Sequence, residues 1–166
     1  MTKERNVIVD DDDKIIGFKN RDEIDYKNDI YRVSALWLVN SEGEILLAQR
    51  HRNKDKDPGV WGPAVSGTVE EGETYYENIV KEAAEEIGLT GVEFVEGPKQ
   101  RIYEPRNFFT QWYVATVEKP EGSFIIKEEE VEKIAWVGPS FLKKDSTEHP
   151  EKYVATMPKI VEIFKL

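Results

Sequence analysis

Residues 67–89 constrain this chain more than any other segment, because they contain a helix with its own start and stop signals. Thr74 is followed by Glu77 at the spacing of a capping box, and Gly88 is placed to end the same helix. Between them, apolar side chains recur at helical spacing. They predict one buried stripe formed by Tyr76, Ile79, Val80, Ala83 and Ile87.

The same helix carries three glutamates on one edge. At about 100° per residue, Glu82, Glu85 and Glu86 fall in a single sector beside the apolar stripe. Like charges at this spacing repel each other by a few tenths of a kcal/mol per pair, roughly, unless a cation lies between them. The pattern therefore predicts either a carboxylate site for a divalent cation or a solvated acidic edge of a helix.

Composition narrows the chemistry of such a site. The 166 residues include 23 Lys and Arg against 33 Asp and Glu, a net charge of −10, with no cysteine and two histidines. Disulfides, thiolate zinc sites and cysteine nucleophiles are thereby excluded, and the remaining metals are hard cations such as Mg²⁺ or Mn²⁺. The acidity argues against nucleic acid or an anionic membrane as a partner.

The densest cluster of positive charge lies in the loop at residues 49–56. In an acidic chain this cluster predicts a local site for binding phosphate, with Arg50 and Lys54 as the first candidates and Arg52 beside them. The alternative is the exposed end of a hairpin that carries solubilising charge.

The remaining patterns predict one α/β domain over residues 1–166, with the sheet covered on both faces. A final helical region is expected at 150–165, kinked or restarted at Pro158. The N-terminus is too charged for a secretory signal, so we expect a cytoplasmic protein. Strands are expected at 7–9 and 15–18, forming an N-terminal hairpin, at 32–40 and 44–49, forming a second hairpin, and at 64–67, 92–95, 100–103, 108–117 and 134–137.

The spacing of the glutamates and glycines resembles the Nudix box, Gly-x5-Glu-x7-Arg-Glu-U-x-Glu-Glu-x-Gly-U, with U an apolar residue. Here it runs from Gly67 through Glu73 to Gly88 and Leu89, with small Ala83 as one U. Its departure is Lys81, where the family has an arginine that pairs with box glutamates. Lysine lacks that bidentate fork but can pair with Glu77 one turn away, so we expect folding to be retained and activity to be reduced or altered.

The resemblance implies an α/β/α sandwich with a mixed central sheet, and a Mg²⁺- or Mn²⁺-dependent hydrolase of small molecules that contain a nucleoside diphosphate. By position, the metal ligands would be the carbonyl of Gly67 and the carboxylates of Glu82, Glu85 and Glu86. The general base would be Glu85, Glu86 or a loop glutamate, for which the run Glu128, Glu129 and Glu130 offers candidates, with a solvated charge cluster as the alternative for that run. Many relatives form homodimers, so the resemblance leaves a homodimer open as one state of this chain.

Beyond the box, the N-terminal hairpin, the basic loop, the Pro-Gly-x-Trp turn at 58–61 and the strand at 64–67 resemble the isopentenyl-diphosphate-isomerase-like branch. Isomerases of that branch use a cysteine where this chain has Ser66, a much weaker acid. We therefore expect a hydrolase acting on a nucleoside di- or triphosphate or a related nucleotide derivative. The alternative is a diphosphate-binding Nudix domain without turnover, made plausible by Lys81.

Overall fold

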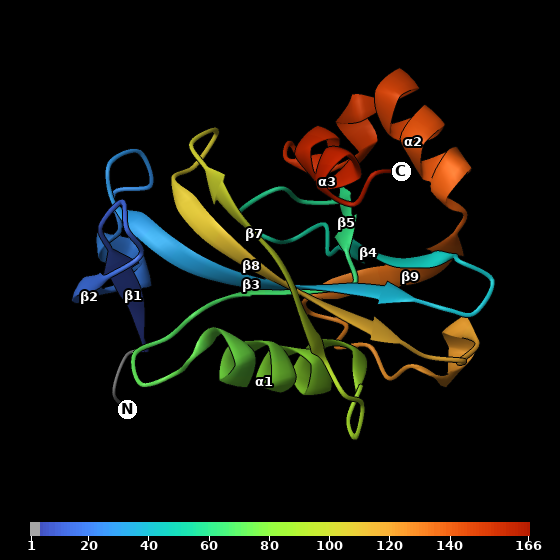
Figure 1. Cartoon of the computed structure of the whole chain (residues 1–166), viewed down its shortest axis with the longest axis horizontal. Coiled ribbons are helices and arrows are strands. Elements are labelled where there is room, and N and C mark those ends of the chain that lie inside the picture. The colour runs from blue at the N-terminus through green and yellow to red at the C-terminus, as the bar shows by residue number, and fades with distance from the viewer. Residues whose placement is uncertain (1–3) are drawn as a thin grey trace.

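Strand β3 (Ile30–Val39) organises the sheet in the computed structural model, which describes residues 4–166 (Figure 1). Along its whole length β3 pairs in parallel with β8 (Phe108–Thr116), and on its other side it pairs antiparallel with β6 (Val65–Thr68). Its first residues pair with β1 (Arg5–Val9), which forms a hairpin with β2 (Ile15–Asn20). The predicted N-terminal hairpin is confirmed.

The second predicted hairpin forms its turn, but its strands separate at once. Strands β3 and β4 (Ile45–Arg50) share only the pair Val39 and Ile45. β4 then pairs with β9 (Val131–Val137) and with β5 (Trp61–Pro63). Because β3 and β4 separate, β6 pairs with β3 while β5 pairs with β4.

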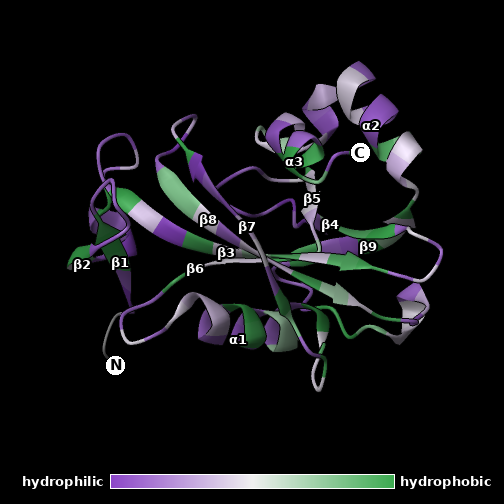
Figure 2. Cartoon of the chain, in the orientation of Figure 1, coloured by the Kyte–Doolittle hydropathy of each residue, from purple (hydrophilic) through white to green (hydrophobic). Residues whose placement is uncertain are grey.

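Helices cover both faces of the nine-stranded mixed sheet, as expected for an α/β/α sandwich. Helix α1 (Tyr75–Ile87) packs on one face, and α2 (Pro139–Glu148) and α3 (Met157–Ile163) pack on the other. The period-two alternation of β3 sends Leu36 and Leu38 towards α1 and Ala35 and Trp37 towards α2 and α3. Hydrophobic residues accordingly concentrate in the strands, and hydrophilic ones in the loops (Figure 2).

Helix α1 begins and ends where the sequence predicts. The side chain of Thr74 accepts a hydrogen bond from the Glu77 amide, Glu77 accepts one from the Thr74 amide, and Gly88 adopts a left-handed conformation with φ of 66°. The buried stripe is narrower than predicted, because Tyr76 and Val80 are 45% and 42% exposed.

The buried face of α1 includes a polar residue, Asn78, in addition to its apolar side chains. Its side chain is fully buried and donates to the carbonyl of Thr68 at 3.1 Å and to Glu73 at 2.9 Å, while Ser34 donates to its oxygen. A buried amide with several partners fixes the rotation of α1 against β6 more tightly than an apolar contact would.

Three expectations were wrong in detail. The strands expected at 92–95 and 100–103 are replaced by one strand, β7 (Val95–Ile102), which begins only at the last residue of the first prediction and whose pairing with β8 shifts register between Glu96 and Lys99. Helix α2 was not expected. The helix expected at 150–165 is divided into a short 3-10 turn, η3 (Pro150–Lys152), and α3, with Tyr153 bridging to Trp61 of β5 between them.

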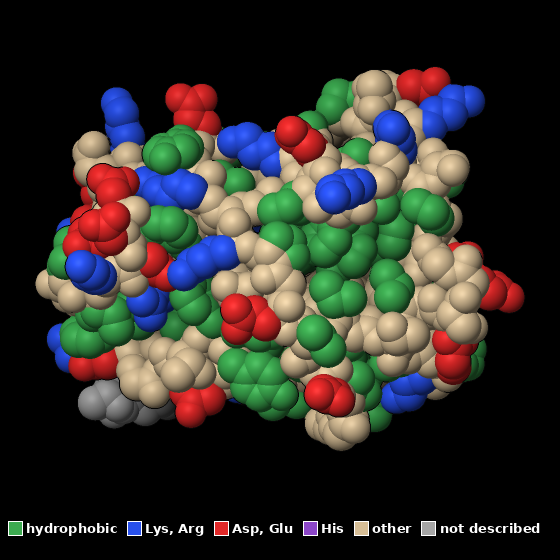
Figure 3. Space-filling view, in the orientation of Figure 1, with side chains coloured by type: hydrophobic (Ala, Val, Ile, Leu, Met, Phe, Trp, Pro, Cys, Tyr) green, Lys and Arg blue, Asp and Glu red, His purple; other side chains and the backbone are tan. Residues whose placement is uncertain are grey.

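The restart of the chain at Pro158 is confirmed, since this proline lies in the first turn of α3. Two further 3-10 turns complete the described chain, η1 (Arg21–Glu23) and η2 (Glu121–Ser123). Within residues 4–166, no helix has the length and apolar character needed to cross a membrane. On the face in Figure 3, charged side chains of both signs surround the N-terminal hairpin, and hydrophobic side chains gather over the middle of the sheet.

Candidate active site

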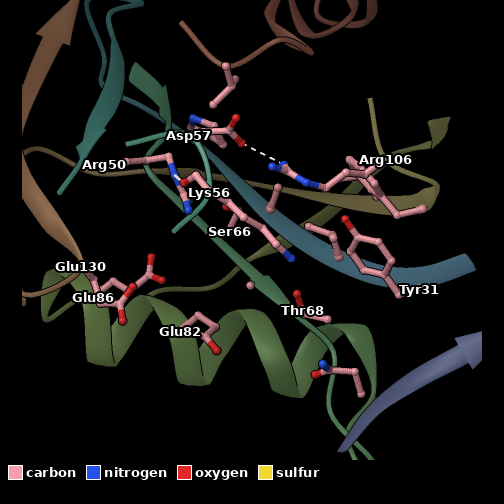
Figure 4. Close-up of a pocket in the computed structure, with 18 of the residues that line it drawn as sticks. Tyr31, Arg50, Lys56, Asp57, Ser66, Thr68, Glu82, Glu86, Arg106 and Glu130 are labelled. Carbon is pink, nitrogen blue, oxygen red and sulfur yellow. Dashed lines mark hydrogen bonds and ion pairs between the residues drawn. The ribbon is translucent and has the colours of Figure 1, made fainter. Parts of the chain in front are cut away.

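A cleft of about 570 Å³ lies between the edge of α1 and the loops that follow β4 and β7. Its volume is in the range of small-molecule sites. One wall carries the glutamates of α1, and the opposite wall carries cations from several distant segments (Figure 4). The site is therefore bipolar, with acidic and basic walls facing one cavity.

All three predicted α1 glutamates line the acidic wall, but their environments differ. Burial raises the pKa of Glu82 to about 7 and that of Glu86 to about 8, and neighbouring carboxylates add to both effects. Glu85 lines the cleft with a more exposed side chain. The buried pair can both be ionised at neutral pH only at a cost in free energy, which a divalent cation would offset.

Gly67 lies directly against Glu82. A Cβ at this glycine would come within 2.5 Å of Glu82 Cγ and 3.0 Å of its Oε1, so any larger residue would displace the carboxylate. The backbone of β6 and the carboxylate of Glu82 therefore pack in contact, which is the proximity that shared ligation of one cation by the two residues would require.

The donor types fit a hard cation, although the side chains are not gathered as a finished site. Gly67 offers a carbonyl, and Glu82, Glu85 and Glu86 offer carboxylates, the oxygen ligands that Mg²⁺ and Mn²⁺ prefer. Within the described part of the chain, no three His, Asp or Glu side chains converge closely enough to hold a metal ion. A cation bound here would need Glu82 and Glu86 to turn towards a common point.

Lys81 does not pair with Glu77 as predicted, because Glu77 is used in the capping box. Its ammonium instead reaches Glu73 at 2.5 Å and Glu70 at 3.0 Å, and lies 3.9 Å from Glu82. These carboxylates raise the pKa of Lys81 although burial opposes them. The lysine thus ties α1 to the loop before it through a box glutamate, the contact that the resemblance assigned to an arginine.

The structure separates the three candidates for a loop base. Glu130 lines the cleft, and its carboxylate forms an ion pair with Lys54. Like charge from Glu130 contributes to the raised pKa of Glu86, so the two carboxyl groups lie near each other (Figure 4). Glu128 and Glu129 are exposed and do not line the cleft. Of the two residues predicted as a possible loop base, Glu129 is therefore misplaced for that role, and only Glu130 lines the cleft.

The basic loop also divides. Arg50 lines the cleft, half-buried, and its Nε donates to the carbonyl of Lys56 at 3.0 Å, which folds the loop back on itself. Lys54 lines the cleft too, but Glu130 occupies its ammonium. Arg52 is not a cleft residue. Its side chain is 74% exposed and pairs with Glu132 of β9, so its predicted role in substrate binding is corrected.

Four further cations line the cleft that the sequence patterns did not indicate, namely Arg21, Lys56, Arg106 and Lys127. Lys56 belongs to the basic loop at residues 49–56, but it was not among the residues of that loop predicted to bind phosphate. Arg21 and Arg106 stand alone in the sequence, and no local spacing connects either of them to the box. Only the pairing of β1 and β8 with β3 brings their segments to the cleft.

The α/β/α fold and the glutamates of the cleft agree with the resemblance to the Nudix box, and comparison with known families gives the same result. The family model for the NUDIX domain matches residues 30–157, most of the chain. This chain belongs to the Nudix domain family.

Its relatives include an uncharacterised Nudix hydrolase of Yersinia pestis, 28% identical over 132 residues, which are 80% of this chain and 71% of that protein. A prenyl-diphosphate phosphatase of Methanosarcina mazei is 30% identical over 165 residues, which are 95% of this chain and 93% of that protein. Among solved structures, a Deinococcus radiodurans protein matches with a TM-score of 0.82 and 21% identity over 96% of this chain and 98% of that one, which supports the fold alone.

Proposed function

We propose that this chain is a Mg²⁺- or Mn²⁺-dependent hydrolase that cleaves a diphosphate linkage in a small molecule. The first candidate substrate is a nucleoside di- or triphosphate or a related nucleotide derivative. One observation carries the proposal. The box glutamates and a set of arginines and lysines line opposite walls of a single cleft (Figure 4). A diphosphate needs both, because cations neutralise its oxygens on one side while carboxylates hold metal on the other.

In this proposal the carbonyl of Gly67 and the carboxylates of Glu82, Glu85 and Glu86 would hold the metal. When bound, Mg²⁺ or Mn²⁺ would supply charge neutralisation of the diphosphate and a lowered pKa for a coordinated water. Arg50 binds and orients the diphosphate from the opposite wall, with its guanidinium positioned by the carbonyl of Lys56. A planar guanidinium suits this task because it donates two parallel hydrogen bonds to phosphate.

For proton transfer we favour Glu130 over its two neighbours. Its carboxylate lines the cleft beside Glu86 and is held by Lys54. A general base must lie within reach of the reacting groups, and this position in the cleft meets that condition. Glu86, whose pKa is raised to about 8, would take that role less readily without a cation beside it.

A prenyl diphosphate is the second candidate substrate. The Methanosarcina mazei relative is named a prenyl-diphosphate phosphatase, and it aligns over nearly the whole of both chains. The apolar and aromatic residues that line part of the cleft, among them Trp112, Val154 and Ile160, would accommodate an isoprenoid tail. A prenyl diphosphate would use the same metal and the same contacts to the diphosphate as a nucleotide, and only the group attached to the diphosphate would differ.

A domain that binds a diphosphate without turnover would follow if Lys81 left the box disordered. The contacts of Lys81 with Glu73 and Glu70 argue against that, because they tie the loop to the helix. We therefore place catalysis ahead of simple binding.

The test is a screen of nucleoside di- and triphosphates and prenyl diphosphates with Mg²⁺ or Mn²⁺, with products identified by mass. We expect release of phosphate, pyrophosphate or a monophosphate that disappears with EDTA. Glu85→Gln and Glu86→Gln should each lower kcat by at least about 100-fold, since each removes a charge from the metal site. Unchanged turnover in both variants would contradict the assignment of the site.

The matched control is Glu148→Gln, which removes one exposed carboxylate from α2, away from the cleft. It should leave kcat and KM as they are. Tight binding without product in the wild type, recovered as turnover by Lys81→Arg, would favour the binding domain instead.

A further inference from the structure

Three cations form the end of the cleft opposite the glutamates of α1, and we call Arg21, Lys56 and Arg106 the cationic end. Arg21 comes from η1, Lys56 from the loop after β4, and Arg106 from the loop before β8. Figure 4 shows Lys56 extending into the cavity and Arg106 reaching towards Asp57 above it. The role proposed above for Arg50 does not explain why three more cations converge here.

The cationic end carries more positive charge than its surroundings neutralise. Arg106 forms an ion pair with Asp57 at 2.9 Å. The ammonium of Lys56 lies 3.1 Å from the centre of the Tyr26 ring, a cation–π contact. Within residues 4–166, neither Lys56 nor Arg21 has a carboxylate at ion-pair distance. Three cations with one carboxylate therefore face the cavity.

The energetic consequence appears at Lys56. Burial, and then the charges of Arg106, Arg21 and Arg50, lower the pKa of this lysine to about 8, and Asp57 opposes the shift only in part. An anion bound among these groups would relieve the repulsion between them.

Aromatic side chains shield the same region. Tyr26 meets Tyr31 edge to face at 5.4 Å between ring centres, and Tyr31 meets Phe108 at 5.3 Å. These rings line the cleft beside the cations and give this part of it an apolar wall. Charge interactions there are stronger than at an open surface, where water screens them.

The cationic end is also continuous with the place assigned to the diphosphate. Arg50 donates from its guanidinium to the carbonyl of Lys56, so the two residues lie side by side, and the charge of Arg50 acts on the Lys56 ammonium. A group bound by Lys56 and Arg106 would therefore be the next along a phosphate chain that already contacts Arg50.

We propose that Arg21, Lys56 and Arg106 form a second anion subsite, which takes a third phosphoryl group linked to the diphosphate. The cleft then selects compounds with a triphosphate chain over diphosphate esters. That these compounds are substrates rests on the proposed function, but the anion subsite is a binding site that exists without turnover.

Asp57 acts in this subsite as a resident counterion that the incoming phosphoryl group must displace from Arg106. Its backbone is left-handed with φ of 50°, a conformation that asparagine also tolerates, so Asp57→Asn removes the charge without straining the loop. Removing this competitor should strengthen anion binding, whereas a purely structural ion pair would give the opposite result.

The first experiment compares binding of inorganic tripolyphosphate and pyrophosphate to the metal-free protein by calorimetry. We expect tripolyphosphate to bind at least about tenfold more tightly, through added charge-assisted hydrogen bonds. Lys56→Gln and Arg106→Gln should abolish this preference, and Lys144→Gln on exposed α2 should preserve it. Equal affinities in the wild type, or a preference that survives both cleft variants, would overturn the proposal.

The second experiment measures the same two affinities in Asp57→Asn. Tighter binding of tripolyphosphate with little change for pyrophosphate supports the subsite, and weaker binding of both overturns it. Circular dichroism of each variant confirms that the chain has folded, and Asp57→Asn provides a variant whose expected effect is a gain.

Glu86→Gln separates this inference from the proposed function. If the inference holds, the variant keeps the preference for tripolyphosphate even though turnover is lost. If the wild type hydrolyses nothing in the substrate screen, the proposed function fails, yet the calorimetric preference still decides the subsite. If turnover occurs but the preference is absent, only the subsite is refuted.

Discussion

Gly67 shows how one residue type can be required by a neighbour rather than by its own backbone. Its φ is ordinary, and the constraint comes from the Glu82 side chain, which occupies the space where a Cβ would lie. A sequence motif records only that glycine stands at this position. The structure supplies the reason, which is close packing of a strand against a buried carboxylate.

Gly67→Ala should therefore lower the free energy of unfolding by about 1–3 kcal/mol, the usual cost of overpacking. It should also weaken Mn²⁺ binding, because Glu82 must move. Urea unfolding and a Mn²⁺ titration followed by electron paramagnetic resonance measure the two effects.

Gly17→Ala is the matched control, since Gly17 of β2 has open space around its Cβ position. We expect it to leave both quantities nearly unchanged. If Gly67→Ala behaved like Gly17→Ala, the contact with Glu82 would have no energetic importance.

At the scale of elements, α1 was predictable and α2 was not, for reasons that lie in their sequences. α1 has a capping box, a glycine stop and an apolar stripe that buries Ile79, Ala83 and Ile87. α2 buries only Leu142 and Ser146 and has no side-chain cap. Its one local start signal is Pro139 in the first turn, so its helical conformation depends largely on packing against α3.

The capping box yields a prediction for α1. Thr74→Ala removes an acceptor for the Glu77 amide, now 3.1 Å from the threonine oxygen, and should cost about 1 kcal/mol of stability. Thr90→Ala, at an exposed site beyond the end of the helix, is the control and should have no effect. Urea unfolding of the two variants side by side measures the difference, and equal midpoints would show that the cap is not needed.

For the whole molecule, acidity sets the dependence of stability on pH. Burial raises the pKa of Glu82 to about 7 and of Glu86 to about 8, from the ordinary value of 4.5. As pH rises above 4.5, these groups lose protons first in the unfolded chain, so the unfolded state is favoured. The free energy of unfolding of the metal-free protein should therefore fall between about pH 4.5 and pH 8.

Groups with lowered pKa, such as Asp13 and Glu73, act in a lower window. They stabilise the fold above their ordinary values, and this contribution is lost only as pH falls further. Urea unfolding in EDTA at pH 5, 6.5 and 8 measures the slope. Glu86→Gln should flatten it, and Mg²⁺ should restore most stability at pH 8. A profile that is flat or rises over this range would contradict the predicted cost of ionising Glu82 and Glu86.

The sequence by itself determined the features whose geometry is local. The caps of α1, the shared edge of Glu82, Glu85 and Glu86, and the N-terminal hairpin follow from spacings of a few residues, and such spacings have one consequence in a helix or a hairpin. The resemblance to the Nudix box also rested on short spacings between residues of one segment. The match of the family model to residues 30–157 agrees with it.

Only the tertiary structure decided which charges share the cleft. Near the start of β9, Glu132 pairs with Arg52 outside the cleft, and Glu130 pairs with Lys54. Strand pairing brings Arg21 and Arg106 into the cleft. Coulomb interactions depend on distances in space, and for these residues the distances are set by pairings between segments far apart in the chain. No local pattern encodes the positions of Arg21 and Arg106, so that part of the basic wall depends on the fold, whereas Arg50, Lys54 and the acidic wall could be predicted from the sequence.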